Sequence, residues 1–365
     1  MKLKKRFLAA MMMSSLFASA FFNTTHAHNS ELIVLKDQGS FAIGGKVIQH
    51  KGKFDPIKQG VFYNKDETGQ SLHGDHAYVF YQVPDKARKY PLVFWHGNGQ
   101  SAQTWQTTPD GRDGFQNIFL RKQYSVYLID QPRRGRAGRS TVGGDLTPNA
   151  DEQSRYGTFR LGVWPDFYPN VQFSKDPKAL EQFFRQMVPN TGPFDAESSI
   201  DAASKLFNKI GDGILVTHSM SGGLGWQTAL RNQHVKGIVS LEPAGNFPFP
   251  KGDEPEPYSL AGRKMNQVVI SKEAFKQLIQ KPILLIYGDN IPDKPTNIPG
   301  EEQFRVFFGQ AKKWNDVAQK YGGKVQLLHL PEIGIYGNTH FPMSDLNNQD
   351  IADLINQFLH EQELD

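Results

Sequence analysis

The chain has 365 residues, with 41 Lys and Arg, 37 Asp and Glu, and no cysteine. This length suffices for one large α/β domain or two small ones with a deep apolar core. Without cysteine, the chain can form neither disulfide bonds nor a thiol nucleophile. The formal net charge is +4, and four basic residues at the start of the sequence account for it: Lys2, Lys4, Lys5 and Arg6. The charge therefore gives no support for nucleic-acid binding.

The first 27 residues have the three parts of a secretory signal peptide: a basic start, an apolar run over residues 7–22, and a small-residue exit. We expect cleavage after Ala27, with Ala20 as the alternative. An uncleaved membrane anchor is less favoured, because the run is short for a bilayer and is interrupted by serines. Because no acidic residue precedes Ala27, cleavage leaves residues 28–365 with a net charge of zero. The signal peptide predicts a periplasmic or secreted protein without a membrane span after cleavage.

Residues 32–84 are typical of short strands and turns. The segment 40–48 resembles one arm of a hairpin, and residues 76–84 form a strand that ends at a proline. His73 and His76 have the spacing of a metal-binding pair, but no third histidine or carboxylate follows at ligand spacing. We therefore interpret them as residues of a surface loop and expect no metal ion or other cofactor.

Apolar runs farther along the chain predict buried strands, since strands covered on both faces lose the usual alternation. They are residues 90–95, 124–129, 213–217, 235–241, 282–287 and 325–330. Segments with helical periodicity lie between or after them, at 201–210, 273–280, 301–321 and 350–363. This alternation predicts one α/β domain over residues 28–365, with a mostly parallel sheet and helices on both faces. Polar residues follow each strand end, where open α/β sheets bind their ligands.

Residues 140–199 interrupt this alternation. They contain few strand signals but many aromatic residues and prolines, together with a helical stretch at 177–187. Long irregular segments in compact domains are usually functional or disordered, and the aromatic content argues against disorder. We expect a lid inserted over the strand ends, with a second irregular stretch, 244–260, as a loop at its edge.

The apolar run that ends at Thr217 is followed by His218-Ser219-Met220-Ser221 and then by a helical segment. This pattern indicates a strand–turn–helix elbow that lifts the Ser219 hydroxyl clear of the sheet. The usual form has glycine two residues before and two residues after the serine, where Thr217 and Ser221 stand here. Ser221 is small, and a β-branched residue is tolerated at a strand end. The alternative is an ordinary strand followed by a serine that caps the helix.

A serine hydroxyl becomes a nucleophile only beside a base that takes its proton, and that base needs an acid to orient it. In enzymes with such an elbow, the three residues occur along the chain in the order serine, acid, histidine, and the histidine follows the last strand of the sheet. His340 is in that place. His329 lies within the predicted strand, His360 lies on an exposed helix, and His218 points away from its neighbour on a tight turn. The alternative for His340 is a loop histidine that caps the last helix.

Two residues compete for the role of the acid. Glu242 directly follows the strand after the elbow helix, and its long side chain can reach across the extra strand spacing. Asp289 follows the next strand, where many such enzymes carry the acid. The usual Gly-x-x-Asp spacing is not matched there, because Asp289 comes early and Asp293 late. We favour Glu242 and keep Asp289 as the alternative.

A tetrahedral intermediate needs two N–H donors for its oxygen anion. The first is expected from the backbone of Met220, directly after the serine. The second should come from the loop that opens with His96-Gly97, where the N–H of Asn98 is favoured and that of Gly99 is second. The alternative for this loop is a simple tight turn, although it stands at the required strand end.

Several further blocks of the sequence are more specific than the elbow alone. They are His96-Gly97, Thr104-Trp105, residues 107–112, 124–131, 135–136, 217–223 and 240–243. With these blocks the chain, from about residue 32 to its end, resembles the α/β-hydrolase superfamily and, more narrowly, a small group of exported bacterial serine esterases. The resemblance implies an α/β-hydrolase fold and a Ser–Glu–His triad, in agreement with Glu242. The pair Asn98-Gly99 varies within the group, so the resemblance does not predict the range of substrates.

Four arginines follow the strand at 124–129: Arg133, Arg134, Arg136 and Arg139. A solvated loop, or an ion pair with Asp130, is the simpler interpretation. Recognition of a carboxylate on the substrate is the alternative.

These residues predict a cofactor-free hydrolase that cleaves a small-molecule carboxylic ester through an acyl-enzyme intermediate. Amide or lactone hydrolysis by the same triad is an alternative, because the lid decides between them. A non-catalytic binding protein on the same fold is less favoured, since no triad member or oxyanion donor is missing. Dehalogenases and epoxide hydrolases on this fold need an aspartate nucleophile, and Ser219 argues against both. The sequence leaves the natural substrate, its acyl chain length and the oligomeric state open, with a dimer among the options.

Overall fold

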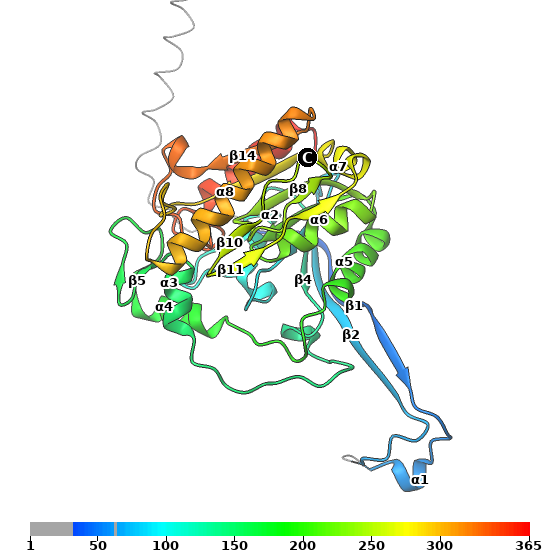
Figure 1. Ribbon diagram of the computed structural model, residues 1–365. Coiled ribbons are helices and arrows are strands. Elements are labelled where there is room, and N and C mark those ends of the chain that lie inside the picture. The colour runs from blue at the N-terminus through cyan, green and yellow to red at the C-terminus, as the bar shows by residue number, and fades with distance from the viewer. Residues whose placement is uncertain (1–31, 62–63) are drawn as a thin grey trace, which may run out of the picture. The chain divides into compact units, whose positions relative to one another are not determined.

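The computed structural model describes residues 32–61 and 64–365, and the expected signal peptide lies outside them. Within the described residues, eight strands form one sheet in the order β1-β2-β4-β3-β7-β8-β13-β14 (Figure 1). Their bounds are β1 Leu35–Gln49, β2 Ser71–Pro84, β3 Leu92–Trp95, β4 Val126–Asp130, β7 Gly213–His218, β8 Val235–Leu241, β13 Ile283–Tyr287 and β14 Val325–His329. The strands from β4 to β14 are parallel, and β1 and β2 are antiparallel additions at one edge. The prediction of a mostly parallel sheet is confirmed.

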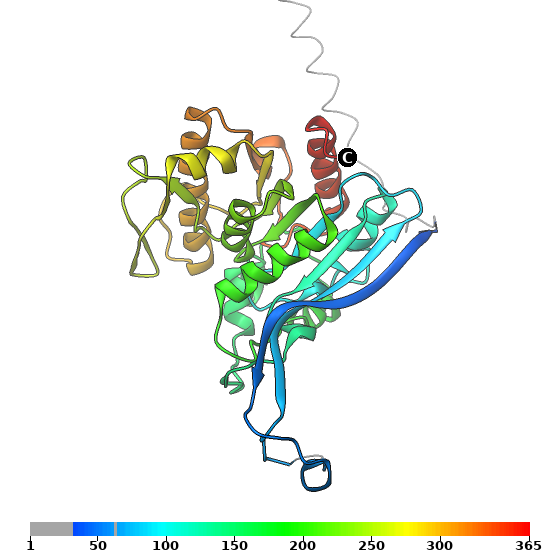
Figure 2. The same ribbon diagram turned by 90° about the vertical axis from the view of Figure 1, so that its right-hand side faces the viewer.

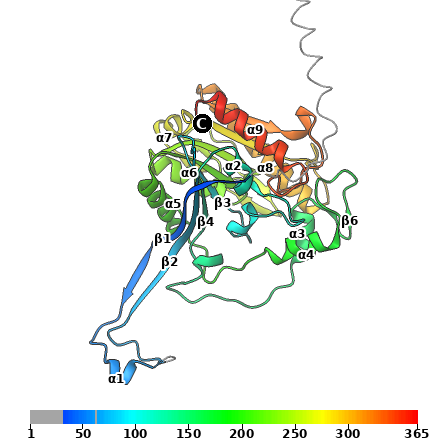
Figure 3. The ribbon, with the colours of Figure 1, turned by 180° about the vertical axis from the view of Figure 1, so that it is seen from behind.

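Helices cover both faces of the sheet, because the central strands send apolar side chains to both sides (Figure 3). α2 (Phe115–Arg121) and α9 (Asn348–Glu361) pack on the face that carries Phe94 and Val216. The other face, with Trp95 and Leu215, is covered by α5 (Ala196–Ile210), α6 (Ser221–Arg231), α7 (Lys272–Ile279) and α8 (Pro299–Lys320). This arrangement confirms the predicted α/β-hydrolase architecture. No helix in the described ranges is long and apolar enough to cross a membrane.

Residues 140–199 form a mainly irregular segment with few regular elements of its own. It contains α3 (Glu152–Thr158), the two-stranded pair β5 (Gly162–Val163) and β6 (Asp166–Phe167), and α4 (Pro177–Arg185). Its aromatic residues Tyr156, Phe159, Phe173 and Phe183 are buried in the core, so they order the segment as expected. The end of the segment already belongs to α5, which begins before the predicted residue 201. The earlier start has a local cause, because the Asp195 carboxylate accepts a hydrogen bond from the Ser198 N–H and caps the first turn.

The stretch 244–260, expected as a loop, contains short strands instead. β9 (Pro248–Pro250) pairs in parallel with β12 (Val268–Ile270), and β10 (Tyr258–Leu260) pairs with β11 (Arg263–Met265). Each pair is three residues long, and β9 has a proline at both ends. Segments of three residues are too short to carry a periodic signal, which explains why the sequence did not predict them.

β1 and β2 form a hairpin arm whose far end extends beyond the rest of the sheet (Figures 1 and 2). The predicted hairpin segment 40–48 lies within β1. The strand predicted at 76–84 begins earlier, because β2 stays paired with β1 as far back as Ser71. His73, opposite Val47, and His76, opposite Gly44, therefore both lie in a strand and not in the surface loop that we expected for this pair. At the far end of the arm, α1 (Pro56–Gln59) begins with a proline.

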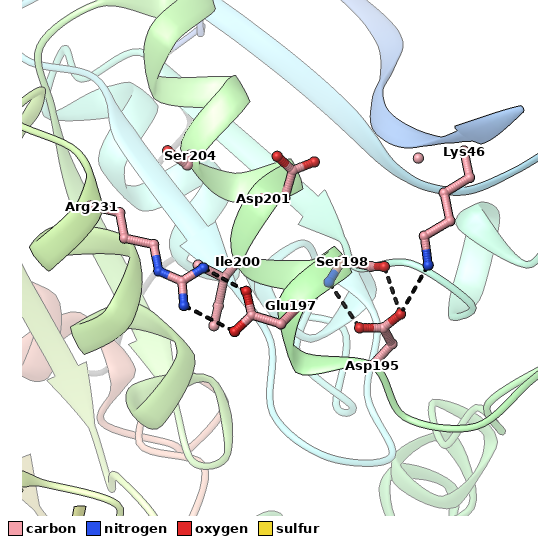
Figure 4. Close-up of a pocket in the computed structure, with 9 residues that line it drawn as sticks. Lys46, Asp195, Glu197, Ser198, Ile200, Asp201, Ser204 and Arg231 are labelled. Atoms are coloured by element: carbon pink, nitrogen blue, oxygen red, sulfur yellow. Dashed lines mark hydrogen bonds and ion pairs between the residues drawn. The ribbon is translucent and has the colours of Figure 1, made fainter. Parts of the chain in front are cut away.

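Ion pairs hold the base of this arm against the domain. Asp75 in β2 is fully buried, and its two oxygens accept hydrogen bonds from the Arg133 guanidinium at 2.7 and 2.9 Å. Close by, a surface cavity of about 360 Å³ is crossed by the pair of Lys46 and Asp195 at 3.5 Å (Figure 4). These pairs join β1 and β2 to the loop after β4 and to the start of α5.

Candidate active site

β7 ends in a turn that holds Ser219 in a left-handed backbone conformation, with φ +55°. Serine rarely adopts a positive φ, and such strained turns cluster at functional sites. Backbone hydrogen bonds hold the turn, from the Ser219 N–H to the Leu241 carbonyl at 3.0 Å and from the Ala244 N–H to the Ser219 carbonyl at 3.2 Å. The N-cap residue of α6 is Met220. Ser219 therefore does not have the helix-capping role considered as the alternative.

The backbone of β3 and its following loop approaches this turn closely. A Cβ atom added to Gly97 would lie 2.9 Å from Cβ of Ser219 and 2.8 Å from Nδ1 of His218. Real side chains do not fit at these distances, so the position requires glycine. Two residues after Ser219, the Ser221 hydroxyl donates to the Trp95 carbonyl at the end of β3, at 2.8 Å. The serine turn is thereby fastened to the end of β3.

Thr217 departs from the usual elbow pattern, and the structure accommodates it through α6. Its methyl group faces Gly225, where an added Cβ would lie 2.8 Å from Thr217 Cγ2. Its hydroxyl donates to Ser240 Oγ at 2.8 Å in the neighbouring strand. A glycine on the helix thus provides the space that the usual pattern provides with a glycine on the strand.

Glu242 stands at the end of β8, fully buried and also in a left-handed conformation, with φ +51°. Its Oε2 lies 3.3 Å from Nδ1 of His340. Its Oε1 accepts hydrogen bonds from Nη2 of Arg160 at 2.6 Å and from the N–H of Gly288. The structure thus brings together two of the residues that the sequence pointed to, Glu242 and His340, and adds an arginine.

Arg160 follows α3, and its side chain is fully buried. Nε donates to the Asp289 carbonyl at 2.9 Å, and the guanidinium lies 4.2 Å from the centre of the Phe304 ring. A charge buried this deeply is tolerated only when it is paired. Sequence reasoning missed Arg160 because no motif marks it. The one local indication of its burial is its position between two apolar residues, Phe159 and Leu161.

The charges in this group determine which forms of Glu242 and His340 are present. Burial alone would raise the pKa of Glu242, but the charge of Arg160 and the hydrogen bond with His340 outweigh it and hold the pKa below its ordinary value. Burial lowers the pKa of His340, against the opposing hydrogen bond and charge of Glu242. Near pH 7 the carboxylate is therefore ionised and the imidazole neutral. These are the forms in which a carboxylate orients a histidine base.

His340 lies on the loop after β14, and this loop is held on several sides. The His340 ring stacks on the ring of Phe159 with centroids 5.4 Å apart, and the backbone N–H of His340 donates to the Phe159 carbonyl at 3.0 Å. Asp345 accepts hydrogen bonds from the N–H and the hydroxyl of Thr339, both at 2.8 Å, and burial raises the pKa of Asp345 to about 7. The N-cap of α9 is Asn347, so His340 does not have the capping role considered as the alternative.

His218, the residue before Ser219, contacts this group. The His218 ring centroid lies 4.5 Å from that of His340, and Nε2 of His218 lies 2.7 Å from the His340 carbonyl oxygen. No hydrogen bond within the described part of the chain links the Ser219 hydroxyl to the His340 imidazole. Catalytic hydrogen bonds are often long before substrate binds and shorten in the complex. Ser219 remains 8% exposed, so it is not sealed in the core.

Asp289, the alternative acid, has other partners. Its carboxylate accepts hydrogen bonds from the Gly337 N–H at 2.7 Å and from the Asn170 amide at 3.3 Å. Its hydrogen bonds therefore fasten the loop that leads to His340, and they do not reach the imidazole.

The predicted oxyanion donors lie on the two segments that meet at Gly97 and Ser219. Met220 is the residue after the serine, and Asn98 and Gly99 follow Gly97 at the end of β3. Gly99 has φ +70°, and its carbonyl accepts a hydrogen bond from the N–H of residue 188 at 2.9 Å. Among the described residues, the backbone N–H groups of Met220 and Asn98 donate to no protein acceptor. Neither N–H group is therefore used by a hydrogen bond within the described part of the protein.

A second cavity, of about 620 Å³, lies between the β10–β11 hairpin and α8 and is lined in part by Tyr258 and Val306. Neither this cavity nor the one in Figure 4 is lined by Ser219, Glu242 or His340. Glu242 and His340 instead contact Arg160 and Phe159 of the segment 140–199. Across residues 32–61 and 64–365, no group of three or more His, Asp and Glu side chains could hold a metal ion.

Comparisons with known proteins agree on the class of enzyme that this chain resembles. No protein-family model matches the chain. It is similar to a solved structure of a novel bacterial esterase, with a TM-score of 0.73 and 30% identity, over 92% of this chain and 98% of that chain. It is also similar to a "Probable secreted lipase phiG" from Fungal sp. (strain ATCC 74256). The two sequences are 29% identical over 321 residues, which make up 78% of this chain and 86% of that protein.

The contact between Glu242 and His340 makes a prediction for the imidazole. The pKa of His340 should lie below the ordinary value of about 6.5. It should fall further in Glu242→Gln, because the hydrogen bond and negative charge that oppose the effect of burial are lost. NMR titration of the ring signals measures both values, with Asp289→Asn as the control that leaves them unchanged. A rise of the His340 pKa in Glu242→Gln would contradict the arrangement described here.

Proposed function

The chain belongs to the α/β-hydrolase superfamily and is a carboxylic ester hydrolase, and we propose that Ser219, Glu242 and His340 form its catalytic triad. One observation carries the proposal: Glu242 lies 3.3 Å from the imidazole of His340 at the carboxyl edge of the sheet, next to a serine in a strained turn. Ester hydrolysis through an acyl-enzyme needs a nucleophile, a base that takes the proton of the nucleophile, and an acid that orients the base.

In the first half of the reaction, the Ser219 oxygen attacks the carbonyl carbon of the ester while Nε2 of His340 takes the serine proton. The carbonyl oxygen becomes an anion, which the N–H groups of Met220 and Asn98 stabilise, with Gly99 as the second choice for Asn98. The intermediate then collapses and the bond to the alcohol breaks. His340 gives its proton to the departing alcohol oxygen, and the acyl group remains on Ser219.

In the second half, a water molecule attacks the acyl carbon while His340 takes one of its protons. The bond between the acyl carbon and the Ser219 oxygen breaks, and His340 returns the proton to that oxygen. Glu242 stabilises the imidazolium in both halves through its contact with Nδ1. Arg160 holds the other carboxylate oxygen at 2.6 Å and keeps Glu242 ionised. Because it touches Glu242 and not the reacting atoms, we assign Arg160 a positioning role.

We propose that residues 140–199 act as a lid within one domain that spans residues 28–365. The support is that the segment supplies contacts to His340, to Glu242 and to the loop after β3. Phe159 stacks on His340, Arg160 binds Glu242, and the N–H of residue 188 donates to the loop after β3. A covering segment of this kind excludes water, which strengthens the electrostatic interactions beneath it.

We also propose that the protein is exported and that its signal peptide is cleaved after Ala27. The support is the basic, apolar and small-residue pattern of residues 1–27, together with the name of a relative that is described as secreted. The intact mass and N-terminal sequence of the exported protein should then correspond to a chain that begins at His28. A product that retains Met1 would contradict the proposal.

A panel of p-nitrophenyl esters with varied acyl chain length tests the proposed activity. Wild-type protein should hydrolyse at least one member, and Ser219→Ala should show no turnover above the uncatalysed background, since it lacks the nucleophile. The release of p-nitrophenol is followed by absorbance. Failure of the wild type on every ester of the panel would refute the proposed function.

A matched pair of variants tests which residue is the acid. Glu242→Gln should lower kcat by about 10³- to 10⁴-fold, because the imidazole loses the partner that orients it and stabilises its charge. Asp289→Asn should stay within a few-fold of the wild type, since an amide oxygen can still accept from the Gly337 N–H. The reverse result would assign the acid to Asp289.

A further inference from the structure

The basic run after β4 separates into arginines with different surroundings. Arg133 forms the buried pair with Asp75 at 2.7 Å, and Arg136 pairs with Asp130 at 3.0 Å. Arg134 lies between them in sequence but pairs with no carboxylate in the part of the chain that the structure describes. Its environment is therefore different from that of its neighbours.

Arg134 is as deeply buried as the core of the protein, with 1% of its surface exposed. Its Nε and Nη2 both face the amide oxygen of Asn190, at 2.9 Å for Nε. Its Nη1 is buried and has no hydrogen-bond partner. An arginine is almost never fully buried unless an anion pairs with it, because the cost of removing the charge from water is otherwise not offset. The amide of Asn190 carries no charge, so Arg134 lacks a counter-ion.

A second arginine adds to this positive charge. Arg155 in α3 pairs with Asp151 at 2.7 Å, and its buried Nε has no hydrogen-bond partner. Burial, followed by the charge of Arg155, lowers the pKa of Arg134 to about 10. The positive charges of Arg134 and Arg155 thus repel each other. Within the described residues, Asp151 is the one carboxylate that pairs with either of them.

The two arginines flank the loop that we propose to stabilise the oxyanion. A Cβ atom added to Gly99 would collide with the Arg155 guanidinium. Arg134 is connected to the same loop through Asn190: its Nε donates to the Asn190 amide oxygen at 2.9 Å, and the N–H of residue 188, two residues earlier, donates to the Gly99 carbonyl at 2.9 Å. In agreement, burial and then the charge of Arg134 lower the pKa of His96 to about 4. Gly99 is two residues beyond Gly97, whose backbone touches Ser219, and two residues span at most about 7 Å. The Arg155 guanidinium beside Gly99 therefore lies within reach of a small substrate bound at the serine, and Arg134 is connected to the same loop through Asn190.

We propose that Arg134, assisted by Arg155, binds a free carboxylate on the substrate, so that the preferred substrates are esters that carry an anionic carboxylate group. This inference rests on the proposed function, because it assigns a substrate class to the same site. A carboxylate supplies the missing counter-charge and accepts hydrogen bonds from the free N–H groups of both guanidiniums. Charge-assisted hydrogen bonds to a planar guanidinium select for a planar anion with two oxygens.

Two pairs of substrates of matched size test the proposal with wild-type enzyme. On the acyl side, mono-p-nitrophenyl glutarate is compared with p-nitrophenyl pentanoate. On the alcohol side, 4-acetoxybenzoate is compared with its methyl ester. In at least one pair, kcat/KM should be about 10- to 100-fold higher for the charged ester, which is the value of one or two hydrogen bonds to a charged group.

Variants then show whether the preference depends on these arginines. Arg134→Gln should lower kcat/KM for the charged ester much more than for the neutral one, so that the preference is lost; glutamine can still donate to Asn190 and so keeps the local packing. Arg155→Gln, on the more exposed side chain, should reduce the same preference, and it serves as the second variant if Arg134→Gln does not fold. The control is Arg139→Gln, which removes an exposed charge from the same run and should change neither value.

The outcomes distinguish this inference from the function on which it rests. If the wild type hydrolyses the neutral ester of both pairs at least as well as the charged one, the carboxylate site is refuted and the esterase proposal stands. Equal losses on charged and neutral esters in Arg134→Gln would also overturn it, since the arginine would then act on the reaction itself. If the wild type hydrolyses none of the four esters, the failure lies with the proposed function.

Discussion

The carboxylate of Glu242 is the group on which the arrangement of the site depends. It is fully buried, and its partners come from three separate parts of the chain: Arg160 from the segment 140–199, the N–H of Gly288 after β13, and His340 from the loop after β14. A buried carboxylate is tolerated only when its oxygens are paired, and the removal of one partner leaves an uncompensated charge. The contacts of this one side chain therefore link the strand ends, the covering segment and the last loop. The fold and the chemistry impose the same requirement here, because the contacts that stabilise Glu242 also keep it ionised beside the imidazole.

The position of the acid has consequences for the rest of the site. With Glu242 at the end of β8, the end of β13 is free for another role, and Asp289 uses its carboxylate to hold the backbone before His340. Its carbonyl accepts from Arg160, which in turn binds Glu242. The two acidic residues that compete in the sequence are thus joined through one arginine. The charge of Arg160 is balanced by the Glu242 carboxylate, whereas no carboxylate of the described residues pairs with Arg134. We therefore assign Arg160 to the positioning of the proposed triad and Arg134 to the proposed recognition of the substrate.

Much of this arrangement could be predicted from the sequence, because it depends on local patterns. Uninterrupted apolar runs reveal the parallel strands, and the abrupt strand ends at Ser219 and Glu242 place both residues at one edge of the sheet. The choice between Glu242 and Asp289 could be weighed but not decided, since both follow neighbouring strands and only the path of the loop to His340 separates them. Arg160 could not be found, because its partners are distant in the chain and no motif surrounds it. The three-residue strands from β9 to β12 were missed for a related reason, since their pairing depends on tertiary contacts and not on periodicity.

The central claim is that Ser219 is a nucleophile activated by the buried pair of His340 and Glu242. Labelling with a fluorophosphonate ester tests it most directly, because the phosphorus bonds to an activated serine oxygen with loss of fluoride. Mass spectrometry of the intact protein and of its peptides should show one adduct per chain, on the peptide that contains Ser219, with loss of ester hydrolysis in proportion to labelling. The rate of labelling should fall strongly in Glu242→Gln. An active enzyme that is not labelled, or one labelled at another residue while Ser219 stays free, would contradict the account.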